Sequence, residues 1–546
     1  MKLPVTLIFL ALLNVSTRAE LRMPSVFGDH MVLQAGKPVA VWGWAAAGEK
    51  VKVVFAGQEK ETIADGEGAW RLQLEVLKPS FKGAVLEASD GSKTLRFEDV
   101  LVGEVWVCGG QSNMEWSLRG SRDADLEVDS ADSPAIRFLR LPKIASHVPR
   151  NDFPPGNPKG LEGRWRRAIP QEVENCTAVG YYFARRLQRR LKVPVGLIDT
   201  SWGGTMAQHW VSLETLRPIA EMKPYFERFE QAVTQWTEGG GEEGAGKRLA
   251  NDVAAWEKKK KEAEESGERV PGRPNPRNYK DPRTKGQPAG MYHGVLLPIA
   301  GTTVRGALFY QGENNSFAES WKPFPKTYPA VVSDWRKAFN NPRLPIGLIQ
   351  IAGWSNRRSM TYDMNHHTNI VREVQHRTWQ ASEQTGLIVT FDTNSNGSIH
   401  PGRKQPVGER TARWALAEVY GVKSRGSQDV LEWRGPVFRE AVVEDGKIIV
   451  SFREGTARGL RLDQDVEVGF YVAGEDRDFH HARARVNRET VEVWCEAVPK
   501  PVAVRYAWSN LPMGGLMNAR ELPAYPFRND SWPLVPHQSQ GEYLVE

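Results

Sequence analysis

Cysteine is scarce in this chain: Cys108, Cys176 and Cys495 are the only three among 546 residues. So low a number excludes a disulfide-stapled scaffold, because such scaffolds carry an even and dense set of cysteines. A single bridge is compatible with the count, and the sequence does not say which pair would form it. Cys108 lies in the apolar run 105–108, where a buried, unreactive thiol is the expected state.

Long apolar runs are also missing, with one short exception at the N-terminus. Residues 7–13 form an apolar stretch that is too short to cross a bilayer. Lys2 precedes it and small residues ending at Ala19 come after it, which is the pattern of a cleaved signal peptide. A buried N-terminal strand is the alternative. We therefore expect residues 1–19 to be a signal peptide, the mature protein to be exported to the periplasm or the cell exterior, and no integral membrane association.

A strong excess of one charge is absent as well. The formal net charge is +6, which is small for 546 residues. No long basic stripe or nucleic-acid motif accompanies it, so a nucleic-acid partner is not expected. The histidines at 366–367, 376 and 480–481 lack a regular ligand spacing with acids, so we do not expect them to bind a metal. No cofactor is expected. Tryptophan, by contrast, is abundant at 19 copies, which is a mild hint of stacking on sugar rings.

The length predicts roughly two to four domains. Residues 20–100 contain short β-branched and aromatic runs separated by turn signals, which predicts an N-terminal β-sandwich-like module. In residues 101–425 short apolar runs alternate with helical stretches, which predicts an α/β domain with a mostly parallel sheet and helices on both faces. Strands return in residues 426–546 as a C-terminal β module.

An interruption of the α/β pattern at 213–290 is predicted to be a charged helical insertion followed by an irregular linker. Its lysine run at 258–261 has two interpretations. The lysines either contact a polyanion or lie on a solvated helix face, where neighbouring glutamates pair with them. We favour the second interpretation, because alternating charge along a helix is typical of a solvent-exposed face.

The strand ends are the informative feature of the α/β part, because ligands of open α/β sheets bind beyond the carboxyl ends of the strands. The first strand runs into Gly109-Gly110-Gln111-Ser112. Small glycines permit a tight turn there and place a serine beside backbone N–H groups. Ser112 is therefore either a nucleophile or the cap of the next helix. The residues alone leave both alternatives open.

Three further strand ends carry polar clusters. The second strand runs into Trp202-Gly203-Gly204, whose N–H groups suit a developing oxyanion. The third runs into Gln311-Gly312-Glu313-Asn314, which is costly to bury without partners and favours a site over a plain turn. The last cluster comprises Asp392 and the loop 395–401 with His400. A structural histidine is the usual alternative, yet among the 11 histidines only this one comes after a sheet strand within a polar loop.

Together these clusters resemble the sialate O-acetylesterase family, a branch of the SGNH hydrolases, and the likeness covers nearly the whole chain. Four blocks of similar residues occur in the same order as in the family, and the length of these blocks makes the resemblance specific. The opening and closing segments are also similar to family members. The blocks are residues 103–114, 196–205, 310–314 and 399–410, and the two further segments are 27–34 and 503–510.

The resemblance implies a flavodoxin-like SGNH hydrolase domain without a metal. It implies Ser112 as the nucleophile and His400 as the general acid and base. It places Gly204 and Asn314 near the oxyanion, together with the N–H group of Ser112. The other residues expected to bind the oxyanion or the substrate are Gln111, Gly203 and Gln311.

One departure from the family pattern concerns the acid that orients the histidine. Family members often have Asp-Ile-His-Pro in the last block, whereas this chain has Ser398 two residues before His400 and Gly397 three before it. A serine cannot carry the negative charge that stabilises an imidazolium. Either Glu313 or Asp392 orients His400, or the site is a Ser–His dyad, or it is impaired. We favour Glu313.

The expected function is hydrolysis of O-acetyl esters on a carbohydrate, with O-acetylated sialic acid as the first choice, through an acetyl-enzyme. Acetylxylan or another polysaccharide is the alternative substrate. The alternative to an active enzyme is a carbohydrate-binding protein with an impaired hydrolase centre. The sequence leaves the oligomeric state open.

Overall fold

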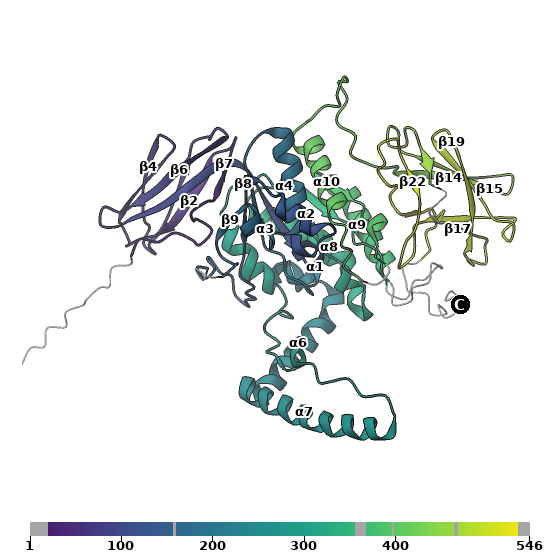
Figure 1. The fold of residues 1–546 in the computed structure, drawn as a ribbon, viewed down its shortest axis with the longest axis horizontal. Helices are drawn as coiled ribbons and strands as arrows, with labels where there is room; N and C mark the ends of the chain where they lie inside the picture. Colours follow the sequence, from purple (N-terminus) through teal and green to yellow (C-terminus); the bar gives the residue numbers. More distant parts are fainter. Residues whose placement is uncertain (1–19, 157–159, 355–366, 396–397, 464–467, 533–546) are drawn as a thin grey trace, which may run out of the picture.

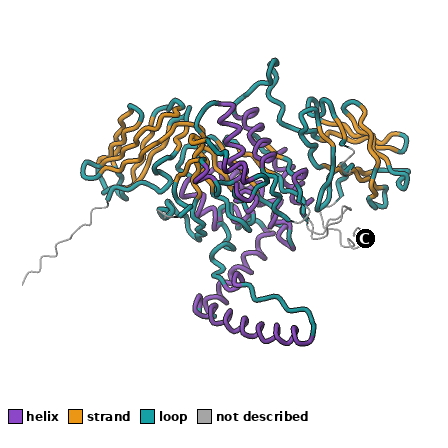
Figure 2. Tube along the Cα trace, in the orientation of Figure 1, coloured by secondary structure: helices purple, strands orange, loops and turns teal. Residues whose placement is uncertain are grey.

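The computed structural model describes residues 20–156, 160–354, 367–395, 398–463 and 468–532. The predicted signal peptide at 1–19 and Gly397 lie outside these residues. A β module, a central part built of helices around a sheet, and a second β module succeed one another along the molecule (Figure 1). Strands dominate the two ends and helices gather in the middle (Figure 2).

The central sheet has the strand order β13-β12-β11-β7-β10-β8-β9. All neighbours from β13 to β8 pair in parallel, and β9 pairs antiparallel with β8. The strands β10 to β13 are buried along their whole length, which explains their continuous apolar runs. The strands are β7 (Thr94–Gly110), β8 (Ser133–Arg140), β9 (Trp165–Ala168), β10 (Val195–Asp199), β11 (Gly306–Tyr310), β12 (Ile346–Ile349) and β13 (Thr385–Ile388).

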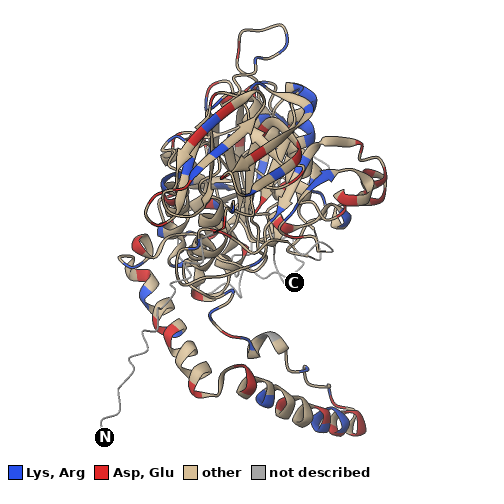
Figure 3. Cartoon of the chain, turned by 90° about the vertical axis from the view of Figure 1, so that its left-hand side faces the viewer, with Lys and Arg blue, Asp and Glu red and all other residues tan. Residues whose placement is uncertain are grey.

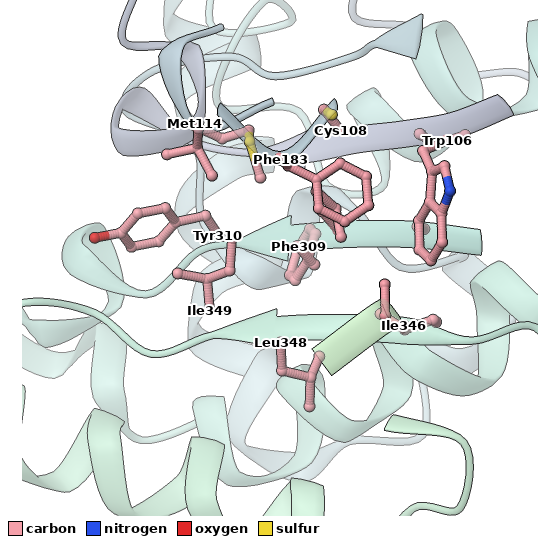
Figure 4. Packing of buried hydrophobic residues seen from close by; sticks show 14 of the residues in the cluster. Trp106, Cys108, Met114, Phe183, Phe309, Tyr310, Ile346, Leu348 and Ile349 are labelled. Carbon is pink, nitrogen blue, oxygen red and sulfur yellow. The ribbon is translucent and has the colours of Figure 1, made fainter. Parts of the chain in front are cut away.

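Helices cover both faces of this sheet. Trp106 and Gly109 point to opposite faces of β7, because side chains alternate along a strand. Trp106 packs edge-on against Phe183 of α4 (Ala178–Leu191), with 5.0 Å between ring centroids. A Cβ on Gly109 would instead meet Trp335 of α8 (Phe324–Ala338). Figure 4 shows Trp106, Phe183 and Phe309 within this core. The predicted α/β class is therefore confirmed as a mixed α/β fold with a large sheet.

Two more long helices complete the layers. The helix α10 (Gln405–Trp414) packs against α4, and a Cβ on its Gly408 would meet Tyr182 and the backbone of Val179. The helix α9 (Thr368–Ala381) packs against α8. Short helices occupy the connections after β7 and β9. They are α1 (Ser112–Glu115), α2 (Ala124–Asp129) and α3 (Pro170–Val173).

The N-terminal module is joined to the central sheet by a single strand. The first half of β7 pairs antiparallel with β6, and its second half lies between β10 and β11. The boundary placed at 100/101 from the sequence thus falls inside one continuous strand. The other strands of the module are β1 (Val32–Gln34), β2 (Val39–Trp44), β3 (Lys50–Phe55), β4 (Gln58–Ile63), β5 (Ala69–Leu74) and β6 (Ser80–Ser89).

The C-terminal module contains two four-stranded antiparallel sheets, β14-β15-β20-β19 and β18-β17-β21-β23, and the pair β16-β22. It docks on the central part through the ion pair between Arg528 and Glu373 of α9, at 2.9 Å. The strands are β14 (Phe438–Glu444), β15 (Lys447–Phe452), β16 (Arg461–Leu462), β17 (Phe470–Ala473), β18 (His480–His481), β19 (Arg483–Asn487), β20 (Thr490–Trp494), β21 (Ala503–Tyr506), β22 (Leu516–Met517) and β23 (Phe527–Arg528).

The insertion forms a helical arm that projects from the central part (Figure 1). It contains α5 (Leu213–Leu216), α6 (Lys223–Glu238) and α7 (Gly241–Ser266). Lysines of α7 pair with glutamates one turn away, as in Lys247–Glu243 at 2.6 Å and Lys260–Glu264 at 3.6 Å. Acidic and basic residues are interspersed along the arm in Figure 3, which agrees with a solvated helix face.

The three cysteines all lie in described segments and are free thiols. Burial raises the pKa of Cys108 and that of Cys176 well above the usual value for a thiol, so neither is a reactive thiolate. Among the described residues, no helix is both long and apolar enough to cross a bilayer. Within the same residues, no cluster of three or more His, Cys, Asp or Glu side chains could hold a metal ion.

Candidate active site

Ser112 lies at the carboxyl end of β7, as the first residue of α1. The turn before it needs glycine at position 110, where φ is +120° and a Cβ would collide with the carbonyl group of Tyr310 in the neighbouring strand. The N–H groups of the first helical turn have no acceptor within a helix. Because Ser112 opens α1, its own N–H group belongs to this set and is suited to bind an anion.

His400 meets Ser112 at this edge of the sheet although 288 residues separate them. Its Nε2 lies 2.7 Å from the Oγ of Ser112. The imidazole is stacked on Trp116, with 5.2 Å between ring centroids and 22° between ring planes. The backbone N–H of His400 donates to the hydroxyl of Ser398 at 3.0 Å. The stacking orients the ring and the Ser398 hydroxyl holds the backbone that carries it, within hydrogen-bonding distance of Ser112.

Burial, and then the positive charge of Lys404, lower the pKa of His400. The neutral imidazole, which accepts a proton from serine, therefore persists to a lower pH than it does in free histidine. We expect the acid limb of kcat/KM to have its midpoint below about pH 6.5, the ordinary value for histidine. A pH–rate profile on an aryl acetate measures this midpoint, and a value clearly above 6.5 would contradict the lowered pKa.

Neither acid proposed from the sequence contacts the imidazole. Asp392 forms a two-pronged ion pair with Arg410, at 2.7 and 2.6 Å, so its assignment as the orienting acid is corrected by this pairing. Glu313 accepts a hydrogen bond from the side-chain amide of Asn113 at 2.5 Å. Among the described residues, no carboxylate hydrogen-bonds the ring of His400. The described part of the site is therefore a Ser–His pair without a directly bonded acid.

Glu313 belongs instead to a buried polar chain behind the pair. The amide of Asn113 donates both to Glu313 and, at 3.1 Å, to the carbonyl of Ile399, the residue before the histidine. The ammonium of Lys404 donates to the side-chain oxygen of Asn113 at 2.5 Å. All three polar side chains are at most 2% exposed. Asn113 thus ties the segment of the nucleophile to the loop of the histidine.

Burial governs the ionisation of the two charged members of this chain. It raises the pKa of Glu313 to about 7, against the hydrogen bond from Asn113 and the charge of Lys404. It lowers the pKa of Lys404 to about 7, against the charge of Glu313. Each charge is therefore tolerated mainly because the other is close. The Oε2 atom of Glu313 is buried and has no hydrogen-bond partner among the described residues.

Two of the predicted oxyanion residues lie beside Ser112 in the structure, and the N–H group of a third is engaged by a carboxylate. The amide of Asn314 donates to the carbonyl of Gly204 at 2.8 Å, and both residues line the same cavity as Ser112. An amide carries a second N–H group, which can serve a ligand. The N–H of Gly203, however, donates to Glu115 at 2.5 Å. Gly203 is therefore not a donor for an oxyanion, although it borders the serine.

The two glutamines hold the strand ends together. The side chain of Gln311 donates to Gln111 at 2.6 Å and to the carbonyl of Thr205 at 2.8 Å. Gln111 in turn accepts from the backbone N–H groups of Gly312 and Asn314, at 3.2 and 3.3 Å. Gln311 is fully buried and does not line the cavity. Its role is to fix the turns, which corrects its assignment as a substrate-binding residue.

Sequence reasoning missed Glu115, which lies three residues after the nucleophile. Its carboxylate accepts from Gly203, from Arg140 at 2.9 Å and from Lys143. These donors, led by Lys143, hold the pKa of Glu115 below its usual value despite the burial of the carboxyl group. The only signal in the sequence was the position of Glu115 directly after the block 103–114. This position does not indicate which groups its carboxylate binds.

A cavity of about 1410 Å³ opens above Ser112 and His400. The insertion closes one side of it with residues of α6 and with the segment 280–286, which returns from the arm. Its cationic side chains far outnumber the single acid, Asp281, and aromatic rings lie among them. The cations are Lys143, Arg228, Lys280, Arg283 and Lys285, and the aromatic residues are Trp202, Tyr225, Phe229, Phe317 and Trp354.

Known proteins resemble this chain in sequence and in structure, although no family model matches it. It is 25% identical to the sialate O-acetylesterase of Mus musculus, covering 93% of each chain. It is 24% identical to that of Homo sapiens, covering 90% of this chain and 88% of the relative. A crystal structure of a carbohydrate acetylesterase from Xanthomonas citri is similar with a TM-score of 0.74 and 28% identity, covering 94% of this chain and 100% of the other.

The fold, the site and these similarities together define a carboxylic ester hydrolase of the carbohydrate esterase class. The resemblance to sialate O-acetylesterases predicted from the sequence is confirmed, and it extends over 93% of the chain.

Proposed function

We propose that this enzyme hydrolyses O-acetyl groups on sialic acids, with Ser112 as the nucleophile of a flavodoxin-like SGNH domain. The observation that carries the proposal is the 2.7 Å contact between the Oγ of Ser112 and the Nε2 of His400, both of which line the cavity. A serine bonded to a neutral imidazole is an activated nucleophile. It is the arrangement that acyl transfer requires.

In the proposed first step, the Oγ of Ser112 attacks the acetyl carbonyl carbon and its proton passes to Nε2 of His400. The oxyanion that forms is stabilised by the N–H of Ser112 and the amide of Asn314, with Gly204 beside them. The C–O bond to the sugar then breaks, and the sugar oxygen takes the proton from His400. This leaves an acetyl ester on Ser112 and a free sugar hydroxyl.

In the second step, a water molecule gives a proton to His400 and attacks the acetyl-enzyme. Collapse of the second tetrahedral intermediate releases acetate, and the proton on His400 returns to Ser112. No carboxylate bonded to the ring assists among the described residues, so the imidazolium relies on its orientation by stacking on Trp116, while the hydroxyl of Ser398 holds the backbone of His400.

The charge of the cavity supports a sialic acid over a neutral sugar. Sialic acids carry a carboxylate, and acetylxylan carries none. Lys285 is half-buried at the cavity wall, and its ammonium lies over Gly204, beside the amide of Asn314. An ammonium in this position can bind the carboxylate of a sugar whose acetyl group is at Ser112. Aromatic rings such as Trp202 offer faces for the sugar ring.

The test is acetate release by the wild-type enzyme from O-acetylated sialic acids and from acetylated xylan, measured side by side. Faster release from the sialic acids, expressed as kcat/KM, is the expected result. Faster release from xylan would contradict the substrate assignment while leaving the esterase chemistry intact. Saturable glycan binding without acetate release would favour the impaired carbohydrate-binding protein instead.

Lys285 offers a sharper test of the substrate assignment. Lys285→Gln is expected to raise KM for an O-acetylated sialic acid about tenfold or more, because one charge-assisted hydrogen bond to the carboxylate is lost. The kinetics of a neutral aryl acetate are expected to change less than about threefold, because no carboxylate takes part. An equal loss on both substrates would instead assign Lys285 to the acetyl-transfer step.

Export belongs to the proposal as well. The sequence pattern of residues 1–19 supports a mature protein that begins at Glu20 and acts in the periplasm or outside the cell. N-terminal sequencing of the protein recovered from its native host checks this. A chain that still begins at Met1 would contradict export by a cleaved signal peptide.

A further inference from the structure

A second cavity, of about 1000 Å³, lies away from the active site. It is formed by the last turns of α4, by α10, and by the segments 422–425 and 520–522. It shares no lining residue with the active-site cavity. The helices α4 and α10 lie side by side in Figure 1, and the cavity is at the end where α4 terminates. Its volume is at the upper end of the range typical of ligand pockets, roughly 300–1,000 Å³.

The lining of this second cavity is strongly basic. Seven arginines and one lysine face two glutamates, an excess of six positive charges that equals the formal net charge of the whole chain. Both glutamates are already engaged by arginines. Glu409 accepts from Arg186 at 2.5 Å, and Glu521 pairs at 2.9 Å with Arg461, which lies outside the cavity lining. Two more of the arginines pair with acids outside the lining, Arg410 with Asp392 at 2.6 Å and Arg520 with Glu432 at 3.8 Å. The acids of the cavity do not neutralise the others.

Three arginines of the second cavity are the best placed to bind an anion. Arg189 and Arg190 come from the last turn of α4, and Arg425 from the segment after α10. None of the three forms an ion pair with a carboxylate of the described residues. The helix dipole favours cations at the end of α4, which accounts for the first two. It does not account for Arg425, which comes from another element, nor for the convergence of cations from four parts of the chain on one concavity.

Crowding of these cations is visible in Arg413 of α10, whose pKa is lowered by burial and then by the positive charge of Arg520. Like charges held together in this way destabilise the empty protein, and a bound anion would relieve the repulsion. Leucine and valine side chains, Leu416 and Val422 among them, also line the cavity. The site thus combines guanidinium groups, which match carboxylates in a two-pronged geometry, with apolar surface.

We infer that the second cavity is a non-catalytic binding site for an acidic, carboxylated glycan chain. Carboxylates would bond to the guanidinium groups of Arg189, Arg190 and Arg425, and the apolar faces of sugar rings would lie on the leucines and valine. The volume fits several sugar units rather than a single small anion. The choice of a glycan over other polyanions rests on the proposed function, because a carbohydrate esterase gains from holding its polymer near the active site.

The experiment measures binding to the full chain carrying Ser112→Ala, so that hydrolysis does not interfere. The probe is an oligomer of galacturonic acid, titrated calorimetrically at low salt, with neutral xylan oligomers as the comparison. The triple variant Arg189→Gln, Arg190→Gln, Arg425→Gln is expected to weaken binding of the acidic oligomer about tenfold or more. The matched control Lys258→Gln, Lys259→Gln, Lys261→Gln removes the same charge from the arm and is expected to leave binding within about twofold.

Several outcomes would overturn the inference. Absence of binding would show that the cavity does not hold an acidic glycan. Equal loss in the arginine and lysine variants would show only diffuse electrostatic attraction. Tighter binding of vesicles containing anionic phospholipid, or of double-stranded DNA, would assign the cavity to another class of partner. The same arginine substitutions in the chain that retains Ser112 are expected to leave aryl acetate hydrolysis unchanged. This last measurement separates failure of the second site from failure of the proposed esterase function.

Discussion

Ser112→Ala is expected to lower kcat for acetate release by a factor on the order of 10⁶, as removal of the nucleophile does in serine hydrolases. His400→Ala is expected to cost a similar factor, because the 2.7 Å contact makes the two residues one functional unit. The double variant should therefore fall no further than either single variant. Residual activity above the uncatalysed rate is expected from the oxyanion donors. The measurement is acetate release or aryl acetate hydrolysis under saturating substrate.

Ser117→Ala provides the matched control for this prediction. Ser117 lies after α1 in the same segment and does not line the cavity, so its loss is expected to change kcat by less than about twofold. Circular dichroism establishes that all variants are folded. A Ser112→Ala protein with wild-type kcat would reject the nucleophile assignment outright. Losses that multiply in the double variant would show that the serine and the histidine act independently.

Lys404→Met is expected to move the acid limb of kcat/KM to higher pH. The positive charge of Lys404 is one of the two causes that lower the pKa of His400, and its removal lets that pKa rise. Protonation of His400 then begins at a higher pH and inactivates the enzyme earlier on acidification. We also expect kcat to fall about 10–100-fold, because Asn113 loses the donor that fixes it between Glu313 and Ile399.

The pH readout distinguishes positioning and electrostatics from simple loss of stability. Leaving the buried oxygen of Asn113 without a donor should cost about 1–3 kcal/mol in unfolding free energy, measured by urea denaturation. Asp392→Asn serves as the control, because it breaks the ion pair with Arg410 and leaves the chain behind the serine intact. That variant is expected to lose stability without a shift of the acid limb. An unshifted limb in Lys404→Met would contradict the coupling to His400.

Much of the catalytic geometry could be predicted from the sequence by one rule. Ser112 and His400 both come after parallel strands, β7 and β13, and the carboxyl ends of such strands share one edge. Their apolar runs were recognisable because these strands are buried on both faces. The strand β8 escaped detection. Its Arg137 is buried and paired with Asp99 at 2.9 Å, so a charged residue interrupts the apolar pattern.

The hydrogen-bond partners of the two candidate acids could not be predicted from the sequence. Glu313 and Asp392 both come after strands that end near the serine, and spacing alone does not decide between them. Their hydrogen bonds decide, since one carboxylate faces Asn113 and the other faces Arg410. The contribution of the insertion to the cavity was equally hidden. Its composition indicates solvent exposure, and only the path of the chain returns residues 280–286 to the serine.

The continuity of β7 limits how the protein can be shortened. Thr94–Gly110 begins in the N-terminal module and ends two residues before Ser112, so no cut between module and catalytic part spares the strand. A cut after residue 100 would separate the half of β7 that pairs with β6 from the half that lies between β10 and β11. Fusion or domain-exchange designs must therefore keep the N-terminal module. Ser112 and that module are expected to move as one rigid body.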